Sequence, residues 1–508
     1  MPIAPPAERP PLIQALLQPT RHRPGTDTVT LVETHISWIL LAGAFAYKIK
    51  KPLKLPFLDF STLALRKQCC DDELRLNRRF APDIYLDVVP ITGEPLDPHL
   101  GGPGLAIEHA VRMRRFDEHG RLDRVCARGA LTADHLNDLA DTLVAFHAAA
   151  AVAPLETRFG SPEHILAPAL DNFRDLAQLL PDARLQLRLA ALRDWTDAEH
   201  RRLTPLMRER KASGQIRECH GDLHLANMVL LDGHVRMFDC LEFNEDLRWL
   251  DTANEIAFTY VDLLDHGKAD LANGFVDAVL SRSGDYAAVP LLRFYAVYRA
   301  LVRAKVAAIR HGQTQGMDET HAAEVCIAQA ERLAAPVAPR LVITHGLSGC
   351  GKTVAARQWL QADPHARSLR LRSDVERKRL FGLAPSQRSG SDTDAGIYTP
   401  DAHARTYQRL AELASAALQA GWSVVVDAAF LQRRERDMFR ALAGLRSVPF
   451  SILAPQADVA VLRERILDRQ RAGQDASEAT IAVLERQLQR IEPLGDDEAA
   501  LRLELPQH

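Results

Sequence analysis

The pattern of apolar and polar positions changes character several times along the chain. Three segments near the start, residues 29–33, 37–41 and 45–49, are rich in β-branched and aromatic residues, which is typical of strands. Residues 131–210 instead repeat Leu and Ala at steps of three and four, the spacing of amphipathic helices. A later strand-like run, residues 340–345, is followed by another helical stretch. The pattern therefore predicts strands and helices in two separate regions.

A proline-containing segment, PVAP, separates these regions by interrupting helix between ERLAA and the later strand-like run. At 508 residues, the chain has room for about two to four domains, each with its own core. The start of the chain repeats proline without an apolar period, which is typical of a flexible tail. The predicted divisions are a tail at 1–26, a first domain at 27–335, a linker at 336–339 and a second domain at 340–508.

Candidate chemistry is concentrated in the string HGDLHLANMVLLDGHVRMFD, residues 220–239. Asp222 lies five residues before Asn227, the spacing at which a kinase loop places its proton-accepting aspartate and a metal-binding asparagine. The apolar runs on either side of an Asp-Gly turn predict a β-hairpin that returns Asp239, a second metal-binding carboxylate, toward Asn227. An isolated Asp and Asn would more simply cap turns. The complete string favours a phosphotransfer site with Asp222 as the catalytic base.

This string resembles the H-G-D-x-H-x-x-N loop of the aminoglycoside phosphotransferase and choline kinase families, whose fold is like that of protein kinases. It differs from protein kinases by having HGD in place of His-Arg-Asp and FDC in place of Asp-Phe-Gly. The resemblance implies a bilobal, kinase-like first domain that acts on a small molecule. It also implies that Asp251, in WLDTANEIAF, braces the catalytic loop.

The strand expected at residues 45–49 carries the lysines that such a site needs. Lys48 and Lys50 lie on one face, because side chains alternate along a strand. By the same resemblance, we expect Lys48 to contact the nucleotide phosphates and Glu73, in the next helix, to pair with it. A solvated lysine run with an exposed acid is the competing interpretation. The glycine-rich loop of protein kinases is missing, since the corresponding turn reads THIS.

A second phosphate-binding motif, GLSGCGKT, occupies residues 346–353 and satisfies G-x-x-x-x-G-K-[ST] between a strand-like and a helical stretch. Its candidate ligands are Gly346, Ser348, Gly349, Cys350, Gly351, Lys352 and Thr353. In such a loop the backbone amides wrap the phosphates, the lysine reaches the β and γ phosphates, and the threonine contacts magnesium. A glycine-rich turn without a ligand would lack this context.

Residues around that loop favour a kinase over a hydrolase. A strand-like run ends in Asp427, a candidate magnesium ligand, and no glutamate follows it to activate water. The segment LRLRSDVERKRLFG resembles the D-x-x-R substrate segment of small P-loop kinases related to gluconate, chloramphenicol and polynucleotide 5′-hydroxyl kinases, which implies Asp374 as a base. The arginine-dense LRERILDRQRAG predicts a mobile lid, with Arg469 or Arg471 closing on the transferring phosphate. An exposed charged helix is the competing interpretation.

Composition argues against several classes of partner. The formal net charge is -3, and no basic stripe is interleaved with aromatics, which disfavours nucleic acid as a ligand. The longest apolar run, residues 36–47, is too short to span a bilayer, and the first residues lack a signal-peptide core. The seven cysteines form no C-x-x-C pair, which fits a reducing compartment. We therefore expect a cytoplasmic protein.

The order of the two motifs resembles bacterial two-domain proteins that fuse an aminoglycoside phosphotransferase-like domain to a small P-loop kinase-like, AAA-family ATP-binding domain. This implies an α+β kinase-like domain followed by an α/β domain with a parallel sheet. We expect a bifunctional phosphotransferase that uses ATP and Mg²⁺ to phosphorylate a hydroxyl of a small molecule, with the acceptor and the oligomeric state left open. Glu242, Glu245 and Asp246 are candidates to receive a cationic amine acceptor. The alternative is a nucleotide-binding sensor whose first domain regulates the second.

Overall fold

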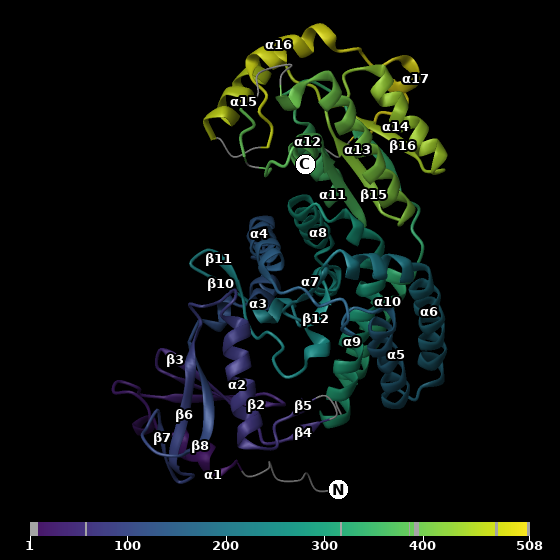
Figure 1. Ribbon diagram of the computed structural model, residues 1–508. Coiled ribbons are helices and arrows are strands. Elements are labelled where there is room, and N and C mark those ends of the chain that lie inside the picture. Colours follow the sequence, from purple (N-terminus) through teal and green to yellow (C-terminus); the bar gives the residue numbers. More distant parts are fainter. Residues whose placement is uncertain are drawn as a thin grey trace. The chain divides into compact units, whose positions relative to one another are not determined.

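The structure is a computed structural model that describes residues 9–55, 58–314, 317–385, 387–390, 396–472 and 476–504. The chain forms two compact units, both visible in Figure 1. Unit 1 consists of residues 1–131, 145–164 and 206–255, and unit 2 of residues 132–144, 165–205 and 256–508. The helices that precede residues 336–339 therefore belong to the same compact unit as the region after them.

Unit 1 contains an antiparallel sheet whose described strands follow the order β1-β2-β3-β8-β6-β7 (Figure 1). They are β1 (Val29–Glu33), β2 (Ser37–Ala42), β3 (Phe45–Lys50), β6 (Tyr85–Glu94), β7 (Asp97–Leu100) and β8 (Ala106–Arg114). The first three confirm the strands predicted from their β-branched and aromatic residues. Helix α2 (Leu63–Asn77) begins where the Thr62 hydroxyl accepts a hydrogen bond from the Leu65 amide, and it packs against β8 and β6.

The predicted catalytic hairpin is also present in unit 1. Strands β10 (Met228–Leu231) and β11 (His234–Met237) pair in antiparallel register. At the turn, Asp232 and Gly233 have φ angles of 51° and 81°, the left-handed backbone that a tight two-residue hairpin turn requires. Strand β9 (Ile216–Glu218) pairs with β12 (Trp249–Asp251), so the two ends of the segment that contains the hairpin are joined. The other short elements are β4 (Lys54–Leu55), β5 (Leu58–Asp59) and α3 (Leu122–Ala127).

The second half of the predicted tail differs from the expectation. Helix α1 (Pro11–Leu16) begins with proline at its first position, where the missing N–H costs no hydrogen bond. Ile13 and Leu16 are fully buried in a cluster that includes Leu40 and Tyr47 of the sheet. Two apolar side chains spaced three apart are enough to attach this short helix to a core, although the surrounding prolines conceal the pattern.

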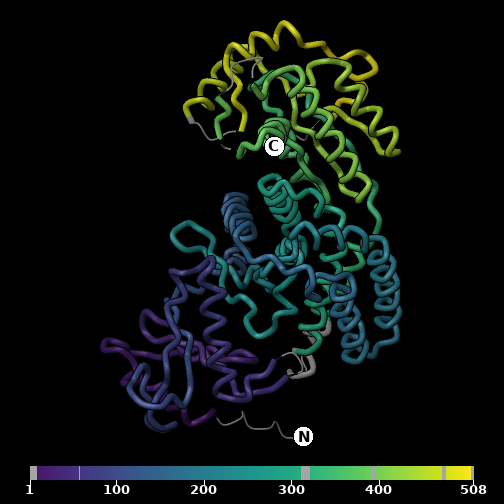
Figure 2. The backbone as a smooth tube through the Cα atoms, in the orientation of Figure 1, coloured from purple at the N-terminus to yellow at the C-terminus, as the bar shows by residue number. Residues whose placement is uncertain are grey.

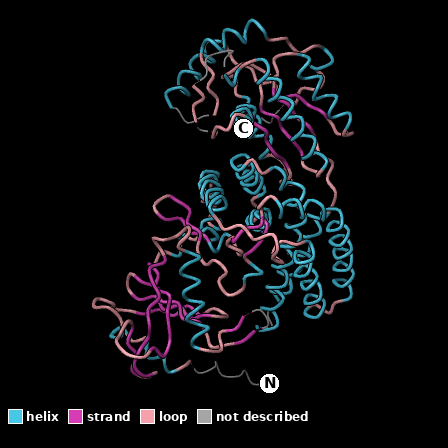
Figure 3. Tube along the Cα trace, viewed as in Figure 1, coloured by secondary structure: helices cyan, strands magenta, loops and turns pink. Residues whose placement is uncertain are grey.

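Residues 131–210 are mainly helical, as their Leu and Ala spacing predicts. The long helices of this region are α4 (Ala133–Ala149), α5 (Pro162–Leu179) and α6 (Ala183–Ala212). Further helices follow at α7 (Thr252–Asp265), α8 (Ala269–Ser283), α9 (Val289–Thr314) and α10 (Met317–Ala334). Figure 3 shows how far helices dominate this part of the chain compared with the strand-rich start of unit 1. Among the described residues, none of the helices combines the length and apolar character needed to cross a membrane.

The part of unit 2 after residue 340 is built on a parallel sheet with the strand order β14-β15-β13-β16. Figure 2 follows the chain from α10 into this sheet. The strands are β13 (Leu341–Thr344), β14 (Ser368–Arg372), β15 (Ser423–Asp427) and β16 (Phe450–Leu453). The surrounding helices are α11 (Lys352–Gln361), α12 (Ser373–Leu380), α13 (Pro400–Gln419), α14 (Arg433–Leu445), α15 (Val459–Ala472), α16 (Ile481–Arg490) and α17 (Asp496–Ala499). Runs such as the valines of β15 are buried, as expected for parallel strands covered on both faces.

Helix α8 covers the outer edge of this sheet. The Asn273 side-chain oxygen accepts a hydrogen bond from the Ser368 amide at 3.1 Å, and the Asp277 carboxylate accepts one from the Arg370 amide at 2.7 Å. Exposed strand edges carry unpaired backbone groups, so these two side chains satisfy donors of edge strand β14. The parallel sheet therefore relies on a helix that precedes it by many residues.

Candidate active sites

The predicted catalytic loop of unit 1, residues 220–227, is closed by the asparagine that the sequence singles out. The Asn227 side-chain amide donates to the Asp222 backbone oxygen at 2.9 Å and to the Asp222 carboxylate at 3.0 Å. The Asp222 side chain is 38% exposed, so its carboxylate is accessible from solvent. The sequence spacing of five residues thus becomes a direct contact between the predicted base and the predicted metal ligand.

Backbone amides of the same loop are held by Glu255 of α7. One Glu255 carboxylate oxygen accepts from the His220 amide at 2.6 Å and from the Gly221 amide at 2.9 Å. The other oxygen lies 2.7 Å from Nε2 of His147. Burial opposes the charge of Glu255, but the hydrogen bonds and charge of its partners outweigh burial and lower its pKa. Glu255 therefore braces the loop as an ionised carboxylate.

His220 is fixed by two hydrogen bonds that define its tautomer. Its Nε2 lies 2.8 Å from the Phe238 carbonyl, which can only accept, while its Nδ1 lies 3.3 Å from the Asp222 amide, which can only donate. The imidazole is therefore protonated at Nε2 and neutral, and burial lowers its pKa. Phe80 stacks on the ring with centroids 5.4 Å apart. His220 thus links the catalytic loop to the end of β11.

Asp251, to which the resemblance assigns a bracing role, forms an ion pair with Arg210 at the end of β12. Its carboxylate forms two hydrogen bonds of 2.8 Å with the guanidinium of Arg210, and both side chains are buried. This pair joins the end of α6 to β12. The carboxylate that receives the loop amides is instead Glu255, four residues further along the chain.

His147, Cys219 and Glu255 place three potential metal ligand atoms within 4.8 Å of one another. Burial raises the pKa of the Cys219 thiol well above its ordinary value, which disfavours the thiolate that a metal requires. The carboxylate of Glu255 is already bonded to the loop amides and to His147. We therefore interpret this group as a hydrogen-bond network that supports the loop.

Asp239 follows the hairpin with a φ of 62°, and its amide donates to the Tyr85 hydroxyl at 3.0 Å. Its carboxylate forms an ion pair with Lys48, whose ammonium also lies 2.8 Å from Glu73. Burial opposes the charge of Asp239, but the Lys48 ammonium outweighs it and lowers the pKa of the carboxyl. Burial likewise opposes the charge of Lys48, yet Asp239 and Glu73 raise its pKa well above the ordinary range. The structure thus brings the predicted Lys48, Glu73 and Asp239 together.

Lys50 forms two further ion pairs, which the sequence did not predict. It is fully buried and pairs with both Glu73 and Glu242. Burial opposes its charge, but these carboxylates raise its pKa. Glu242 was a candidate to receive a cationic amine, and this expectation is wrong because Lys50 already occupies the buried carboxylate. Its long separation from β3 in the sequence gave no signal of the pairing.

The phosphate-binding loop of unit 2 follows the buried strand β13 and leads into α11. Gly346, Gly349 and Gly351 have φ angles of 142°, 86° and 100°, a backbone that side chains rarely adopt. The Lys352 ammonium donates to the carbonyls of Gly346 at 3.0 Å and Leu347 at 2.8 Å. The lysine is therefore folded back over the start of the loop that would receive the β and γ phosphates.

Asp427 lies at the end of β15, in the strand next to β13. Its buried Oδ2 has no hydrogen-bond partner among the described residues, and Nε of Arg372 lies 3.9 Å from it. A buried carboxylate oxygen without a hydrogen bond is costly unless a cation approaches it. The surroundings of Asp427 therefore fit a magnesium ligand.

Asp374 and the two lid arginines have different environments. Asp374 is in the first turn of α12. Burial of Tyr398 and the negative charge of Asp374 raise the pKa of the Tyr398 hydroxyl. Arg377 lies 5.1 Å from the centre of the Tyr398 ring. Arg469 has two buried nitrogens, Nε and Nη2, without a hydrogen-bond partner among the described residues. Arg471 is exposed and pairs with Asp468 at 3.1 Å. Arg469 is therefore the better placed of the two to receive an anion.

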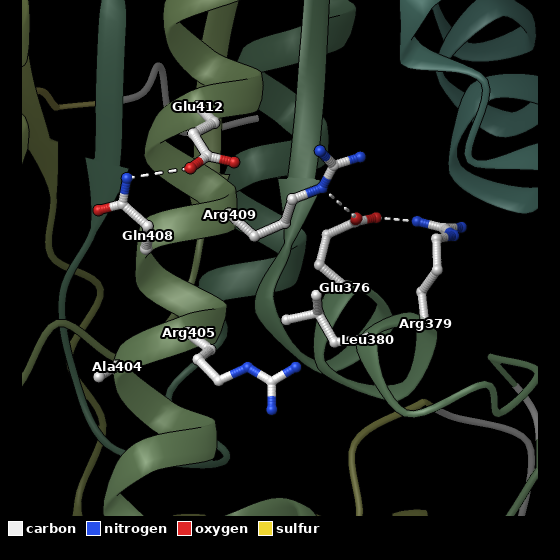
Figure 4. A pocket seen from close by; sticks show the side chains of 8 residues that line it. All are labelled: Glu376, Arg379, Leu380, Ala404, Arg405, Gln408, Arg409 and Glu412. Atoms are coloured by element: carbon white, nitrogen blue, oxygen red, sulfur yellow. Dashed lines mark hydrogen bonds and ion pairs between the residues drawn. The ribbon is translucent and has the colours of Figure 1, made fainter.

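A shallow depression between α12 and α13 shows how α12 is anchored (Figure 4). The buried Glu376 lies between Arg379 and Arg409, with its carboxylate 4.0 Å from Nε of Arg409 and paired to Arg379. Arg405 projects into the depression. Since Asp374 is two residues before Glu376 on the same helix, this ion pairing fixes the helix that carries the predicted base.

Two family models match separate parts of the chain. Residues 70–289 match the phosphotransferase enzyme family, and residues 341–494 match an AAA domain. The first match contains the catalytic loop and the second contains the phosphate-binding loop. These matches confirm the two-domain resemblance inferred from the motifs and the kinase-like and P-loop fold classes that it implied.

Relatives and solved structures extend this comparison. An uncharacterized protein of Mycobacterium tuberculosis is 29% identical over 467 residues, which cover 91% of each chain. Choline kinase from Cryptosporidium parvum is 11% identical, with 63% of this chain and 93% of that chain covered and a TM-score of 0.40. Wild-type aminoglycoside 2′-phosphotransferase-IIIa, solved with GDP, is 13% identical, with 64% and 99% covered and a TM-score of 0.39.

Proposed function

We propose that this chain, which joins a domain of the phosphotransferase enzyme family to an AAA domain, transfers the γ-phosphate of ATP to a hydroxyl of a small molecule. A kinase-type phosphotransfer follows from the family match. The observation that carries the proposal further is the assembly of Asp222, Asn227 and Asp239 with the Lys48–Glu73 ion pair in unit 1. Phosphoryl transfer requires a base, metal ligands and a cation for the phosphates, and this group supplies each of them.

The residues of unit 1 fit these roles. Asp222 has an accessible carboxylate, which would accept the proton of the acceptor hydroxyl. Asn227 and the ionised Asp239 offer oxygen ligands of the kind that Mg²⁺ prefers, and the ion would neutralise charge on the phosphates. Lys48 has a raised pKa and so stays positively charged for the α and β phosphates.

We propose that unit 2 is a second phosphotransferase, so that the chain is bifunctional. Its phosphate-binding loop supplies Lys352 and backbone amides, and Thr353 and Asp427 would hold magnesium. Asp374 would accept the proton from the second acceptor. The second acceptor is also proposed to be a small molecule, because the chain has a formal net charge of -3.

Magnesium-dependent transfer from radiolabelled ATP tests both sites. A panel of sugars, amines, nucleosides and aminoglycosides is incubated with wild type, Asp222→Asn and Lys352→Ala. Two charge-matched controls use exposed positions: Asp232→Asn in the hairpin turn, and Arg357→Ala on α11. We expect Asp222→Asn and Lys352→Ala each to abolish a different labelled product while both controls retain both products.

Other outcomes separate the alternatives. If Lys352→Ala alone abolishes transfer while ATP still binds unit 1, the first domain is a nucleotide-binding regulator and bifunctionality is wrong. If neither substitution reduces transfer relative to its control, the assignment of both catalytic sites is wrong.

A further inference from the structure

Helices α15 and α16 both contact the phosphate-binding loop directly. Leu462 and Ile466 of α15 and Leu484 of α16 form a buried cluster with Cys350 of the loop. A Cβ added to Gly349 would lie only 2.9 Å from the Leu462 carbonyl oxygen, so the two backbones meet without space for a side chain. The two helices are therefore part of the surroundings in which the loop binds phosphate.

One hydrogen bond in this region uses a backbone amide of the loop that would otherwise bind a phosphate oxygen. The Ser348 amide donates a hydrogen bond of 2.8 Å to the side-chain oxygen Oε1 of Gln487, on α16. Backbone amides of this loop type bind phosphate oxygens. The negative end of the Gln487 carbonyl dipole therefore satisfies a donor that a phosphate oxygen would otherwise use.

The position of this contact identifies the phosphates concerned. Lys352, which reaches the β and γ phosphates in such loops, donates to the carbonyls of Gly346 and Leu347. Ser348 is the next residue, so its amide belongs to the same end of the loop. Both anion-binding donors, the lysine and the amide, are satisfied internally by neutral carbonyl oxygens.

We propose that Gln487 competes with the terminal phosphates of the nucleotide for the Ser348 amide. The inference rests on the proposed binding of nucleotide at this loop. A charged phosphate oxygen forms a hydrogen bond about twice as strong as a neutral carbonyl does, so the phosphate displaces Gln487. Displacement separates α16 from the loop at this point, and part of the binding free energy is used for it.

The competition also affects α15, the helix that carries Arg469 of the predicted lid. Its Nε and Nη2 are buried without hydrogen-bond partners among the described residues, and it lies on α15, whose Leu462 and Ile466 pack with Leu484 of α16. Release of Gln487 removes one polar tie between this helix pair and the loop. Phosphate binding at the loop therefore weakens the contact between the loop and the helix pair to which Arg469 belongs.

The test measures binding of a fluorescent ATP analogue with Mg²⁺ to the full chain. The contribution of the loop is defined as the binding lost in Lys352→Ala. We expect Gln487→Ala to lower the dissociation constant of this component about three- to tenfold, the value of one net hydrogen bond. Gln487→Glu is expected to raise it, because a carboxylate holds the amide more strongly and repels the phosphates. Gln489→Ala, at an exposed position of the same helix, is the matched control and should leave binding unchanged.

Hydrogen exchange of the peptide containing Ser348 provides an independent measurement. Without nucleotide, Gln487→Ala should exchange faster there than wild type, and with ATP the two should agree, because phosphate has replaced the glutamine. Weaker or unchanged ATP binding in Gln487→Ala would overturn the competition, whatever the effect of Gln487→Glu. If Lys352→Ala removes no binding component, the loop binds no nucleotide and the proposed function of unit 2 fails together with this inference.

Discussion

Replacing Glu255 tests whether a buried carboxylate holds the catalytic loop in place. Glu255 is 1% exposed, and one of its oxygens accepts hydrogen bonds from the His220 and Gly221 amides. Glu255→Ala would leave both amides buried without an acceptor, and each such group costs about 1 to 3 kcal/mol. We therefore expect unit 1 to lose about 2 to 6 kcal/mol of unfolding free energy by the same estimate. Glu255→Gln keeps a side-chain oxygen for the amides and should cost much less.

Urea unfolding monitored by tryptophan fluorescence measures this loss, with Lys352-dependent nucleotide binding as the internal control for unit 2. The pH dependence gives a second measurement. Because the folded pKa of Glu255 is lowered from 4.5, its contribution is complete above that pH and is lost as the pH falls through the folded value. Glu255→Gln should reduce this acid sensitivity. Equal midpoints for wild type and Glu255→Ala, or equal losses for the Ala and Gln variants, would refute the bracing role.

Three further changes test other parts of the structure. Arg210→Met leaves Asp251 buried without its partner and should cost about 3 to 5 kcal/mol in urea unfolding, whereas an equally stable variant would show that the pair contributes nothing. Gly349→Ala forces a Cβ to within 2.9 Å of the Leu462 carbonyl at a φ of 86°, so Lys352-dependent ATP binding should fall at least about tenfold, and normal binding would contradict the close contact. Burial lowers the pKa of His220 below 6.5, so at lower pH the unfolded chain binds a proton that the folded chain does not, and the free energy of unfolding should fall as the pH drops below that value. His220→Asn should reduce this loss of stability. An unchanged loss would exclude His220 as its source.

The parts of unit 1 that the sequence predicted are those with strong local signals. Segments rich in β-branched and aromatic residues predicted β1 to β3, and the Asp-Gly turn predicted the hairpin before Asp239. The five-residue spacing brought Asp222 and Asn227 into hydrogen-bond contact. Period two placed Lys48 and Lys50 on the same face, but the sequence did not show that both are buried.

The parts that the sequence missed depend on contacts between distant segments. Glu255 lies 35 positions after His220, whose amide it accepts from, in a helix whose apolar spacing gives no reason to single out one acid. Gln487 is separated from Ser348 by 139 positions, and a glutamine on a charged helix is ordinarily a surface residue. A buried polar residue can be recognised only after the fold shows which donors lack a partner.

Strand β3 holds the segment that follows the hairpin through two lysines, which pair with two acids of that segment. Lys48 pairs with Asp239, Lys50 pairs with Glu242, and both lysines share the carboxylate of Glu73. These contacts hold the segment at two points. Both side chains of the Lys50–Glu242 pair are buried, so removing one of them is costly, whereas the Asp239 side chain is 43% exposed. The three acids carry one charge more than the two lysines, and burial correspondingly raises the pKa of Glu242. The magnesium ion proposed to bind at Asp239 would offset that excess of negative charge.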